Sequence, residues 1–329
     1  MLFRSVRGGH GWGDWLSFGN KTPIEFIDTV YFASSARMMA EMGEAIGKSA
    51  EAAAYRDLFA KIKSAFGGNY LRADGSLTVD NQTAYALALW ADLIPEESRS
   101  QSGKILADKL RGAETSDNSG MTTGFLGTRP LLPVLSAVGE NDLAVKHFQS
   151  RKFPSWGYEV EQGATSIWER WNSYTKEHGF NGPDGKQNAG MNSFAHYSFG
   201  AVCEWMLQDL AGIQSASPGY KSIVIRPRPP TPGSNLERKP IDWVKAHHDS
   251  IRGRISTEWR QAGDVFELRV EIPPNTTATV FLPATANAQI FEGGRPIAEV
   301  SSVKLVRKEL ATAVLSIGSG AYHFTVRKN

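Results

Sequence analysis

The hydrophobic pattern of this chain changes its period near residue 218. Before that point, apolar residues recur every three or four positions, as in Ile27, Val30 and Tyr31, which is typical of amphipathic helices. After it, apolar and polar residues alternate, as in 266–272 and 322–326, which is typical of half-buried strands. The predicted strands follow one another without intervening helices. We therefore expect a multidomain chain that is first α-helical and then all-β.

A cluster of prolines marks the predicted boundary between the two parts. Six of the sixteen prolines lie within 23 residues, at positions 218, 227, 229, 230, 232 and 240. Proline interrupts regular secondary structure, and a chain of 329 residues has about the length of two domains. We therefore predict a helical domain over residues 1–217 and a β domain over residues 218–329.

The helical part is expected to contain about seven helices. Their predicted positions are around 27–46, 55–66, 87–94, 96–111, 127–138, 141–150 and 192–211. The predicted N-caps are Asp80 and Asn192. The predicted helix ends are Gly47, Gly67, Gly112 and Gly212. Two further stretches, 112–125 and 151–190, show no period, and loops of that length in a compact domain are usually functional or disordered.

The β part is expected to form an antiparallel sandwich of about seven or eight strands. Turn signals such as Pro273-Pro274-Asn275 and Gly293-Gly294 separate the alternating segments at short intervals. Because the connections are short, neighbouring strands are expected to run in opposite directions.

The composition does not favour several classes of partner and cofactor. With 36 basic and 34 acidic residues, the formal charge of +2 makes neither nucleic acid nor a membrane an expected partner. The single cysteine, Cys203, allows no internal disulfide. We find no nucleotide-binding, zinc-protease or serine-hydrolase motif, so we expect no cofactor and no metal. The sequence shows neither a membrane-spanning apolar run nor a signal peptide, and it leaves the compartment open.

Nine tryptophans distinguish the composition. They lie at positions 12, 15, 90, 156, 168, 171, 205, 243 and 259, and most are near Gly, Asp or Glu in the first two thirds of the chain. An exposed indole beside a carboxylate suits a sugar, because the ring stacks on an apolar sugar face while the carboxylate accepts hydrogen bonds from hydroxyls. Burial of the indoles in a core is the alternative interpretation.

The first candidate segment is Gly11-Trp12-Gly13-Asp14-Trp15-Leu16. Its carboxylate lies between two indoles, and its glycines allow a ligand or another backbone segment to come close. Asp14 therefore either accepts hydrogen bonds from sugar hydroxyls or caps a helix while Trp12 and Trp15 are buried.

Two other candidate segments lie later in the helical part. In Trp168-Glu169-Arg170-Trp171, Glu169 is either a general base or part of a Glu–Arg network within a Trp-lined core. In the helix predicted to start at Asn192, His196 either donates a hydrogen bond to a sugar hydroxyl or is structural. The His247-His248 pair in the β part has neither Cys nor carboxylates at ligand spacing and predicts no metal site.

The candidate segments also carry a close resemblance to a known family. The chain resembles the α-L-rhamnosidases of glycoside hydrolase family 78 in five runs that follow in order along nearly its whole length: GWGDWLSFG, TGFLGTRPLLPVLSAVGENDLA, PSWGYEVEQGATSIWERWNSY, MNSFAHYSFGAVCEWM and GYKSIVIRPRP. The resemblance implies an (α/α)6 toroid, here partial, followed by a C-terminal antiparallel β-sandwich. This agrees with the helix-then-strand pattern.

The resemblance also implies an inverting hydrolase of terminal α-L-rhamnose. Inversion requires a carboxylic acid that protonates the leaving oxygen and, roughly 6.5–9.5 Å away, a carboxylate that activates water. By resemblance, the general base is Glu169 in the family's W-E-R-W motif. His196 matches a family histidine that would contact the sugar and help to hold the water.

Further residues match the family's sugar-binding positions, and the implied partner is a rhamnose-containing oligosaccharide or glycoside. Asp14 with Trp12 or Trp15 matches the rhamnose-binding loop, and Trp156 matches an aromatic wall. Rhamnose is a 6-deoxy sugar, so its methyl group offers such a wall an apolar group to bury. The expected substrate-binding residues are Trp12, Asp14, Trp15, Trp156, Trp168, Trp171 and His196.

One segment of the family pattern has no counterpart in this sequence. In the family, the general acid Glu lies in an R-D-E-R-x-G-W-x-G-D-like segment upstream of the G-W-G-D-W loop, where this chain has only MLFRSVRGGH. We therefore expect the C-terminal part of a longer enzyme, without the acid and about five of the toroid's helices. We expect negligible hydrolysis of aryl α-L-rhamnosides. We also expect self-association through an open edge near 23–47 and 192–211.

Two other functions stay open at this point. The chain could be a non-catalytic carbohydrate-binding protein that retains the Trp-lined pocket, in which case rhamnose would bind without turnover. It could also be a toroid enzyme with another sugar specificity or a lyase, which an anomer-resolved NMR assay across several glycosides would distinguish.

Overall fold

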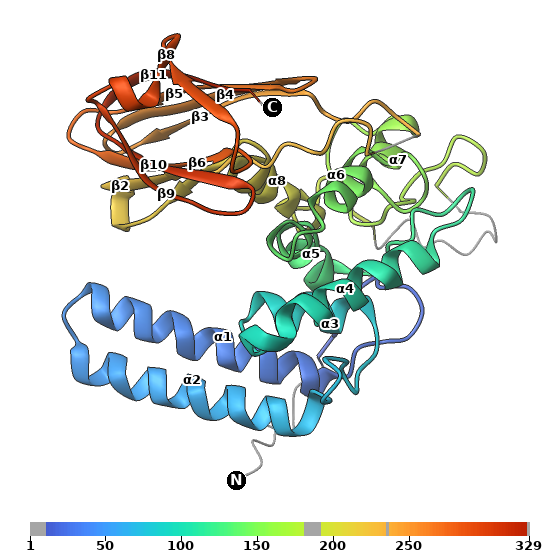
Figure 1. The fold of residues 1–329 in the computed structure, drawn as a ribbon. Coiled ribbons are helices and arrows are strands. Elements are labelled where there is room, and N and C mark those ends of the chain that lie inside the picture. The colour runs from blue at the N-terminus through green and yellow to red at the C-terminus, as the bar shows by residue number, and fades with distance from the viewer. Residues whose placement is uncertain (1–10, 181–191, 235–236, 328–329) are drawn as a thin grey trace. The chain divides into compact units, whose positions relative to one another are not determined.

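The computed structural model describes residues 11–180, 192–234 and 237–327. The chain divides into two compact units, Met1–Ala201 and Val202–Asn329, and each is described by itself (Figure 1). The boundary predicted from the prolines lies further along the chain than this division. The reason is that β1 (Ile213–Ser215), which precedes the prolines, pairs with β2 (Ser222–Ile225) in the C-terminal unit.

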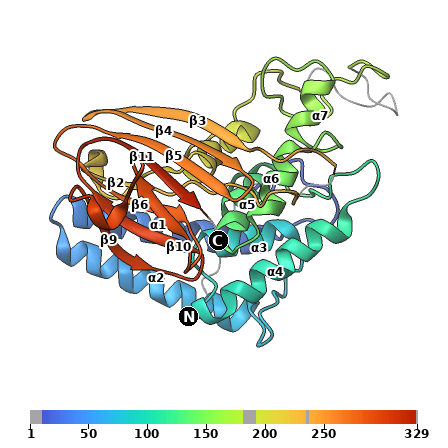
Figure 2. The same ribbon diagram turned by 45° about the horizontal axis from the view of Figure 1, so that its top comes forward.

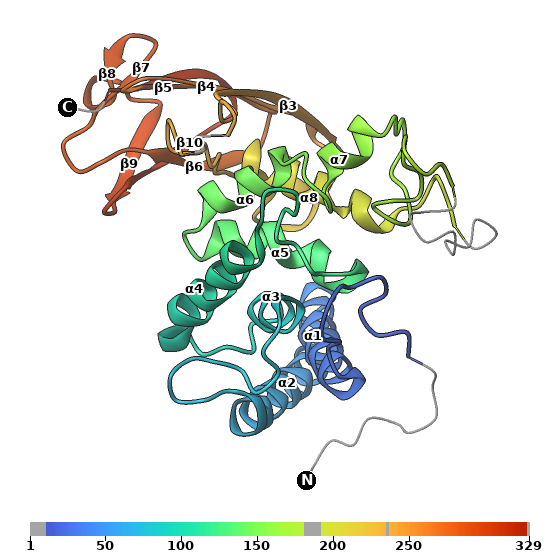
Figure 3. The same ribbon diagram turned by 90° about the vertical axis from the view of Figure 1, so that its right-hand side faces the viewer.

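The N-terminal unit is built from helices that pack against one another in chain order. They are α1 (Ile24–Ala45), α2 (Ser49–Tyr70), α3 (Gln82–Trp90), α4 (Glu96–Ala113), α5 (Phe125–Ala137), α6 (Asn141–Gln149) and α7 (Trp156–Glu161), with a 3-10 helix, η2, at Ser198–Ala201. α1 packs along α2, α3 packs against α4 and α5, and α5 packs against α6 (Figure 3). The unit is therefore a series of helical hairpins.

The centre of this unit is α3. Every residue from Gln82 to Leu89 is buried, because the QTAYALALW helix is apolar on nearly all sides. By contrast, α2 buries only Ala52, Ile62 and Phe66. α3 is therefore an inner helix, and α2 presents most of its surface to solvent.

Several predicted helix ends differ from the observed ones. Asn81 caps α3, because its Oδ1 accepts from the Ala84 backbone N–H at 2.9 Å, whereas the predicted cap, Asp80, accepts from the Tyr85 hydroxyl. Helix α2 continues through Gly67 to Tyr70, and α4 continues through Gly112 to Ala113. Gly47 and Gly212 do follow helical segments with positive φ, of 75° and 86°.

The prediction of one helix over 192–211 is wrong. Residues 192–197 are not helical, and Asn192 binds the Ser173 hydroxyl at 2.7 Å instead of capping a helix. The helical segment begins at Ser198 and changes from 3-10 to α8 (Val202–Trp205) to a π-helical turn, η3 (Met206–Leu210). Conversely, α7 lies within the segment 151–190 in which no period was found, and the Ser155 hydroxyl caps it.

The C-terminal unit is the expected β domain, with two sheets (Figure 2). The five-stranded sheet has the order β1-β2-β6-β10-β9, and the six-stranded sheet has the order β3-β4-β5-β11-β7-β8. The remaining strands are β3 (Trp243–Ser250), β4 (Gly253–Ala262), β5 (Val265–Ile272), β6 (Thr277–Pro283), β7 (Gln289–Glu292), β8 (Arg295–Pro296), β9 (Val303–Lys308), β10 (Thr312–Ile317) and β11 (Gly320–Arg327).

The strand pairing explains the period of two in the sequence. β5 and β11 pair antiparallel, and their alternate residues, such as Phe266, Leu268 and Phe324, are buried. The described residues form more strands than the seven or eight expected, because several are only two to four residues long. One pair, β2 with β6, is parallel, so the five-stranded sheet is mixed. None of the described helices has the length and hydropathy needed to cross a bilayer.

Candidate functional site

The carboxylate of Asp14 is buried and fully hydrogen-bonded. Its Oδ2 accepts from the Thr83 hydroxyl at 2.5 Å and the Gly124 N–H at 2.8 Å, and its Oδ1 accepts from the N–H groups of Leu126 at 2.8 Å and Gly127 at 3.0 Å. Gly124 precedes α5, and Leu126 and Gly127 lie in its first turn, where the N–H groups of a helix have no internal acceptors. Asp14 therefore caps α5, which is one of the two roles predicted for it, and these bonds fill the four lone-pair positions of a carboxylate.

Backbone contacts fasten the loop that carries Asp14 to the start of α5. The Phe125 N–H donates to the Trp15 carbonyl at 2.9 Å, and the Phe18 N–H donates to the Thr122 carbonyl at 2.8 Å. A Cβ on Gly124 would collide with the Trp15 carbonyl oxygen, so a side chain at position 124 would displace the loop. This close approach explains the first glycine, Gly124, in the TGFLGT run.

Glu169 lies where three segments distant in sequence meet. Its Oε2 accepts from the Ser193 N–H at 2.9 Å, and its Oε1 accepts from the Trp15 indole N–H at 3.5 Å. The segments 167–169 and 193–196 pair antiparallel, because Glu169 N–H donates to the Ser193 carbonyl and His196 N–H to the Ile167 carbonyl, both at 2.8 Å. The carboxylate is therefore held in place while remaining partly exposed.

His196 lies on the same pair of segments as Glu169. Its Nδ1 accepts from the Ser198 N–H at 3.3 Å, so in the neutral imidazole the proton is on Nε2, which is then a donor. The ring packs against Phe125, with centroids 4.8 Å apart, and stacks on Tyr197 at 5.0 Å. The structure thus places His196 and Glu169 on the same pair of segments, and their expected roles as sugar contact and general base stay predictions.

The loop around Asp14 carries two indoles, and that of Trp15 contacts Glu169. Trp12 is 77% exposed, and its ring meets the ring of Trp15 edge to face at 5.2 Å. Trp15 is half-buried and donates to Glu169. Trp12 is therefore the expected tryptophan whose ring is most available to a ligand.

The other three expected tryptophans form a core beneath this surface. Trp171 stacks on Phe199 at 3.9 Å, Trp156 meets Trp171 edge to face at 5.2 Å, and Trp168 packs on Phe194 at 5.6 Å. Their exposed fractions are 1%, 8% and 5% for Trp171, Trp156 and Trp168. Their faces are thus covered by protein, which agrees with the alternative interpretation as core residues.

The Glu–Arg network considered for the W-E-R-W motif does not form among the described residues. The segment is not helical, and no ion pair joins Glu169 to Arg170 there. Instead, the Arg170 N–H donates to the Ser173 hydroxyl at 3.2 Å, which shapes the turn after Glu169. Within the described ranges, no group of three or more His, Cys, Asp or Glu side chains is placed to bind a metal ion.

Sequence reasoning missed Glu159, a buried carboxyl group on α7. Its side chain is 2% exposed and accepts a hydrogen bond from the backbone N–H of Trp168. Burial raises the pKa of Glu159 to about 8, so the carboxyl is protonated at neutral pH. The local signal for this helix was Ser155, a residue type that favours N-cap positions.

Curated relatives match nearly the whole of this chain. An alpha-L-rhamnosidase of Streptomyces avermitilis is 40% identical over 321 residues, which cover 98% of this chain and 28% of the relative. An alpha-L-rhamnosidase of Formosa agariphila is 34% identical over 326 residues, which cover 97% of this chain and 33% of the relative. The chain thus spans about a third or less of the length of these relatives.

Solved structures match in the same way. The crystal structure of the Streptomyces avermitilis alpha-L-rhamnosidase complexed with L-rhamnose superposes with a TM-score of 0.83 at 38% identity, covering 98% of this chain and 28% of that one. The alpha-L-rhamnosidase from Dictyoglumus thermophilum superposes with a TM-score of 0.80 at 28% identity, covering 96% of this chain and 34% of that one.

Two family models match successive parts of the chain. Residues 4–210 match the bacterial alpha-L-rhamnosidase 6 hairpin glycosidase domain, and residues 212–295 match the bacterial alpha-L-rhamnosidase C-terminal domain. With the helical hairpins, the two β-sheets and the Glu169 site, these matches identify the chain as a member of the bacterial alpha-L-rhamnosidase family, in which a six-hairpin glycosidase domain precedes a β domain.

Proposed function

We propose that this chain acts in the hydrolysis of terminal α-L-rhamnosides with inversion, and that Glu169 is the general base. The main support for this proposal is that Glu169 is partly exposed and, among the described residues, accepts hydrogen bonds only from Trp15 and Ser193. A carboxylate has about four lone-pair positions, so acceptor capacity remains for a water molecule. The L-rhamnose complex of the Streptomyces avermitilis relative supports rhamnose as the sugar.

The proposed reaction is a single displacement at the anomeric carbon of the rhamnose. A water molecule held by Glu169 attacks this carbon from the face opposite the leaving oxygen. As the new carbon–oxygen bond forms, the water transfers a proton to the Glu169 carboxylate. The electron pair of the glycosidic bond passes to the leaving oxygen, which takes a proton from a general acid. The product is β-L-rhamnose.

Each residue around Glu169 has a separate role in the proposal. The Trp15 indole and the Ser193 N–H orient the carboxylate, and the Nε2–H of His196 donates to a sugar hydroxyl. The exposed ring of Trp12 stacks on the apolar face of the rhamnose. Asp14 positions the loop that carries Trp12, because its own lone pairs are filled by α5 and Thr83.

The neighbouring buried carboxyl groups are unsuited to act as the general acid. Asp14 is enclosed by four donors, and Glu159 is only 2% exposed and accepts from the Trp168 backbone. A fluoride leaving group departs without needing a proton, so α-L-rhamnosyl fluoride makes the reaction depend on the base alone. This substrate therefore tests the proposed role of Glu169 directly.

The experiment follows hydrolysis of α-L-rhamnosyl fluoride by NMR. We expect β-L-rhamnose to appear first and Glu169→Gln to lower the rate by about 10²–10⁴-fold, since general base catalysis is worth about that much. The matched control is Glu161→Gln, because Glu161 pairs with Arg151 on the surface. Initial formation of the α-anomer, or an unchanged rate in the Glu169→Gln variant, would contradict the proposal.

A non-catalytic rhamnose-binding protein is the second candidate. It is favoured by the burial of Asp14 and Glu159, which removes both from the possible general acids. For this function we expect L-rhamnose to bind and the binding to weaken in a Trp12→Ala variant, while α-L-rhamnosyl fluoride is not hydrolysed. Catalysed release of β-L-rhamnose from the fluoride would exclude it.

A further inference from the structure

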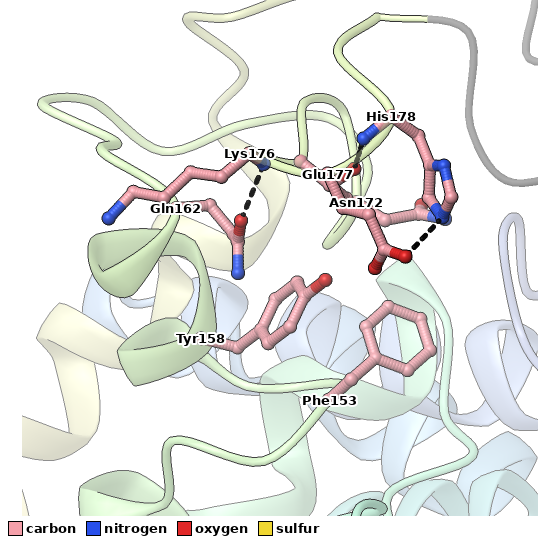
Figure 4. A pocket seen from close by; sticks show the side chains of 8 residues that line it. Phe153, Tyr158, Gln162, Asn172, Lys176, Glu177 and His178 are labelled. Carbon is pink, nitrogen blue, oxygen red and sulfur yellow. Dashed lines mark hydrogen bonds and ion pairs between the residues drawn. The ribbon is translucent and has the colours of Figure 1, made fainter.

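A pocket of about 370 Å³ lies between α7 and the loop that follows Glu169 (Figure 4). Its lining residues come from 153–162 and 172–178, and none of them contributes to the Glu169 site described above. Pockets for small ligands have volumes of roughly 300–1,000 Å³, so this one is large enough for a single sugar ring.

The floor of the pocket is aromatic. The rings of Phe153 and Tyr158 meet edge to face with centroids 5.3 Å apart, and Phe18 meets Phe153 at 5.5 Å. Phe153 and Tyr158 are both partly exposed, and Phe18 is 39% exposed. Such a floor offers ring faces to the C–H groups of a pyranose.

The walls of the pocket carry groups that match sugar hydroxyls. Gln162 Oε1 accepts from the Lys176 backbone N–H at 2.9 Å, which turns its amide nitrogen toward the space above Tyr158 (Figure 4). On the opposite side, Glu177 and His178 pair at 3.5 Å. Burial and the Glu177 carboxylate raise the pKa of Tyr158, so its hydroxyl remains a donor.

The charges of the walls favour a neutral ligand. Lys176 lines the pocket, and the carboxylate of Glu177 is next to it in sequence and lines the same pocket. An anionic ligand would meet that carboxylate, whereas a sugar hydroxyl can donate to the carboxylate and accept from an amide. The occupant that fits best is therefore an uncharged pyranose.

The floor of the pocket is joined to the Glu169 site by a short piece of chain. Trp15 donates to Glu169, and Phe18, three residues later, contacts Phe153. Trp15 and Phe18 are three residues apart in the chain, so their Cα atoms are at most about 11 Å from each other. Asn172, which also lines the pocket, follows Glu169 by three positions.

We propose that this pocket binds the neutral pyranose to which the terminal rhamnose is attached. The inference rests on the proposed function, because an enzyme that removes a terminal sugar must also accommodate the group on the other side of the cleaved bond. The aromatic floor packs against the apolar face of this second ring, while Tyr158 and Gln162 bind its hydroxyls.

The test compares the binding of two sugars to the same chain by calorimetry. The probes are L-rhamnose and a disaccharide in which α-L-rhamnose is linked to D-glucose. We expect the disaccharide to bind more tightly, by about 10-fold or more, because the second ring adds hydrogen bonds and ring contacts. In a Tyr158→Phe, Gln162→Ala variant, we expect most of this gain to be lost and the affinity for L-rhamnose to stay unchanged.

Matched controls distinguish an effect of the pocket on sugar binding from the general effects of substituting Tyr or Gln. Tyr55→Phe on α2 and Gln101→Ala on α4 make the same chemical changes at sites outside the pocket and should leave both affinities unchanged. If L-rhamnose binds and the disaccharide binds no more tightly, or if the pocket variant weakens both sugars equally, the pocket assignment is wrong. If neither sugar binds, the proposed function itself fails.

Discussion

Two carboxyl groups in the N-terminal unit are almost equally buried and have very different surroundings. Asp14, at 4% exposure, accepts hydrogen bonds from one hydroxyl and three backbone N–H groups. Glu159, at 2% exposure, accepts from the Trp168 backbone, and its Oε1 has no hydrogen-bond partner among the described residues. Because Glu159 has few donors to offset its burial, its pKa is raised to about 8.

We expect Glu159 to make the stability of the protein depend on pH. Its pKa in the folded chain, about 8, lies above its ordinary value of 4.5, so the folded state binds the proton more tightly than the unfolded state. The resulting stabilisation is complete below about pH 4.5 and is lost as the pH rises through about 8. Glu159→Gln keeps the shape without the charge and should remove this loss, which is on the order of a few kcal/mol.

Thermal unfolding at pH 5, 7 and 9 measures this effect. The unfolding temperature of the unmodified chain should fall more between pH 5 and pH 9 than that of the Glu159→Gln variant. Glu161→Gln, on the same helix but exposed, serves as the control and should behave like the unmodified chain. Parallel pH profiles for the unmodified chain and Glu159→Gln would contradict the assignment.

We expect Asp14→Ala to destabilise the N-terminal unit by about 2–4 kcal/mol, because it combines the loss of a helix cap with buried donors left unpaired. Asp14→Asn retains one oxygen acceptor and should cost less. Urea denaturation followed by circular dichroism measures both changes, with the exposed Asp28→Ala on α1 as the control. A cost for Asp14→Ala no larger than that of the control would show that the cap contributes little.

At the scale of elements, α1 exposes an apolar stripe. Met38 and Met42 share one face of α1, Ile46 follows the end of the helix at the same spacing of four, and the three are 48%, 53% and 73% exposed. Contiguous exposed apolar surface favours association between molecules. The expected self-association therefore involves α1, whereas the predicted helix over 192–211 did not form.

We expect the chain to self-associate through this stripe and the double variant Met38→Glu, Met42→Glu to be monomeric at concentrations where the unmodified chain is not. The introduced charges would have to be desolvated in any contact made by this face. Light scattering coupled to size-exclusion chromatography measures the molar mass. The control, Ser100→Glu with Gln101→Glu, adds the same charge to exposed positions of α4. A monomeric unmodified chain would refute the prediction.

Among the elements, amphipathic helices and alternating strands were predicted well, and irregular segments were not. α4 and α6 lie close to their predicted positions because their apolar spacing is local. The segment from Ser198 to Leu210 contains three kinds of helical turn, which no single period describes. Helix α7 was missed because its six residues are too few to show a period.

At the scale of the whole molecule, the sequence determined the order of domains, the family and the candidate base. The change of period near 218 is a local property of the chain, and the W-E-R-W motif that contains Glu169 can be read directly. Only the tertiary structure showed which contacts each candidate residue makes. Asp14 caps α5 because this helix, more than a hundred residues away, supplies most of its donors. Trp171 is a core residue because Phe199 covers its face. Such roles depend on contacts between distant segments, which residue types and spacing do not contain.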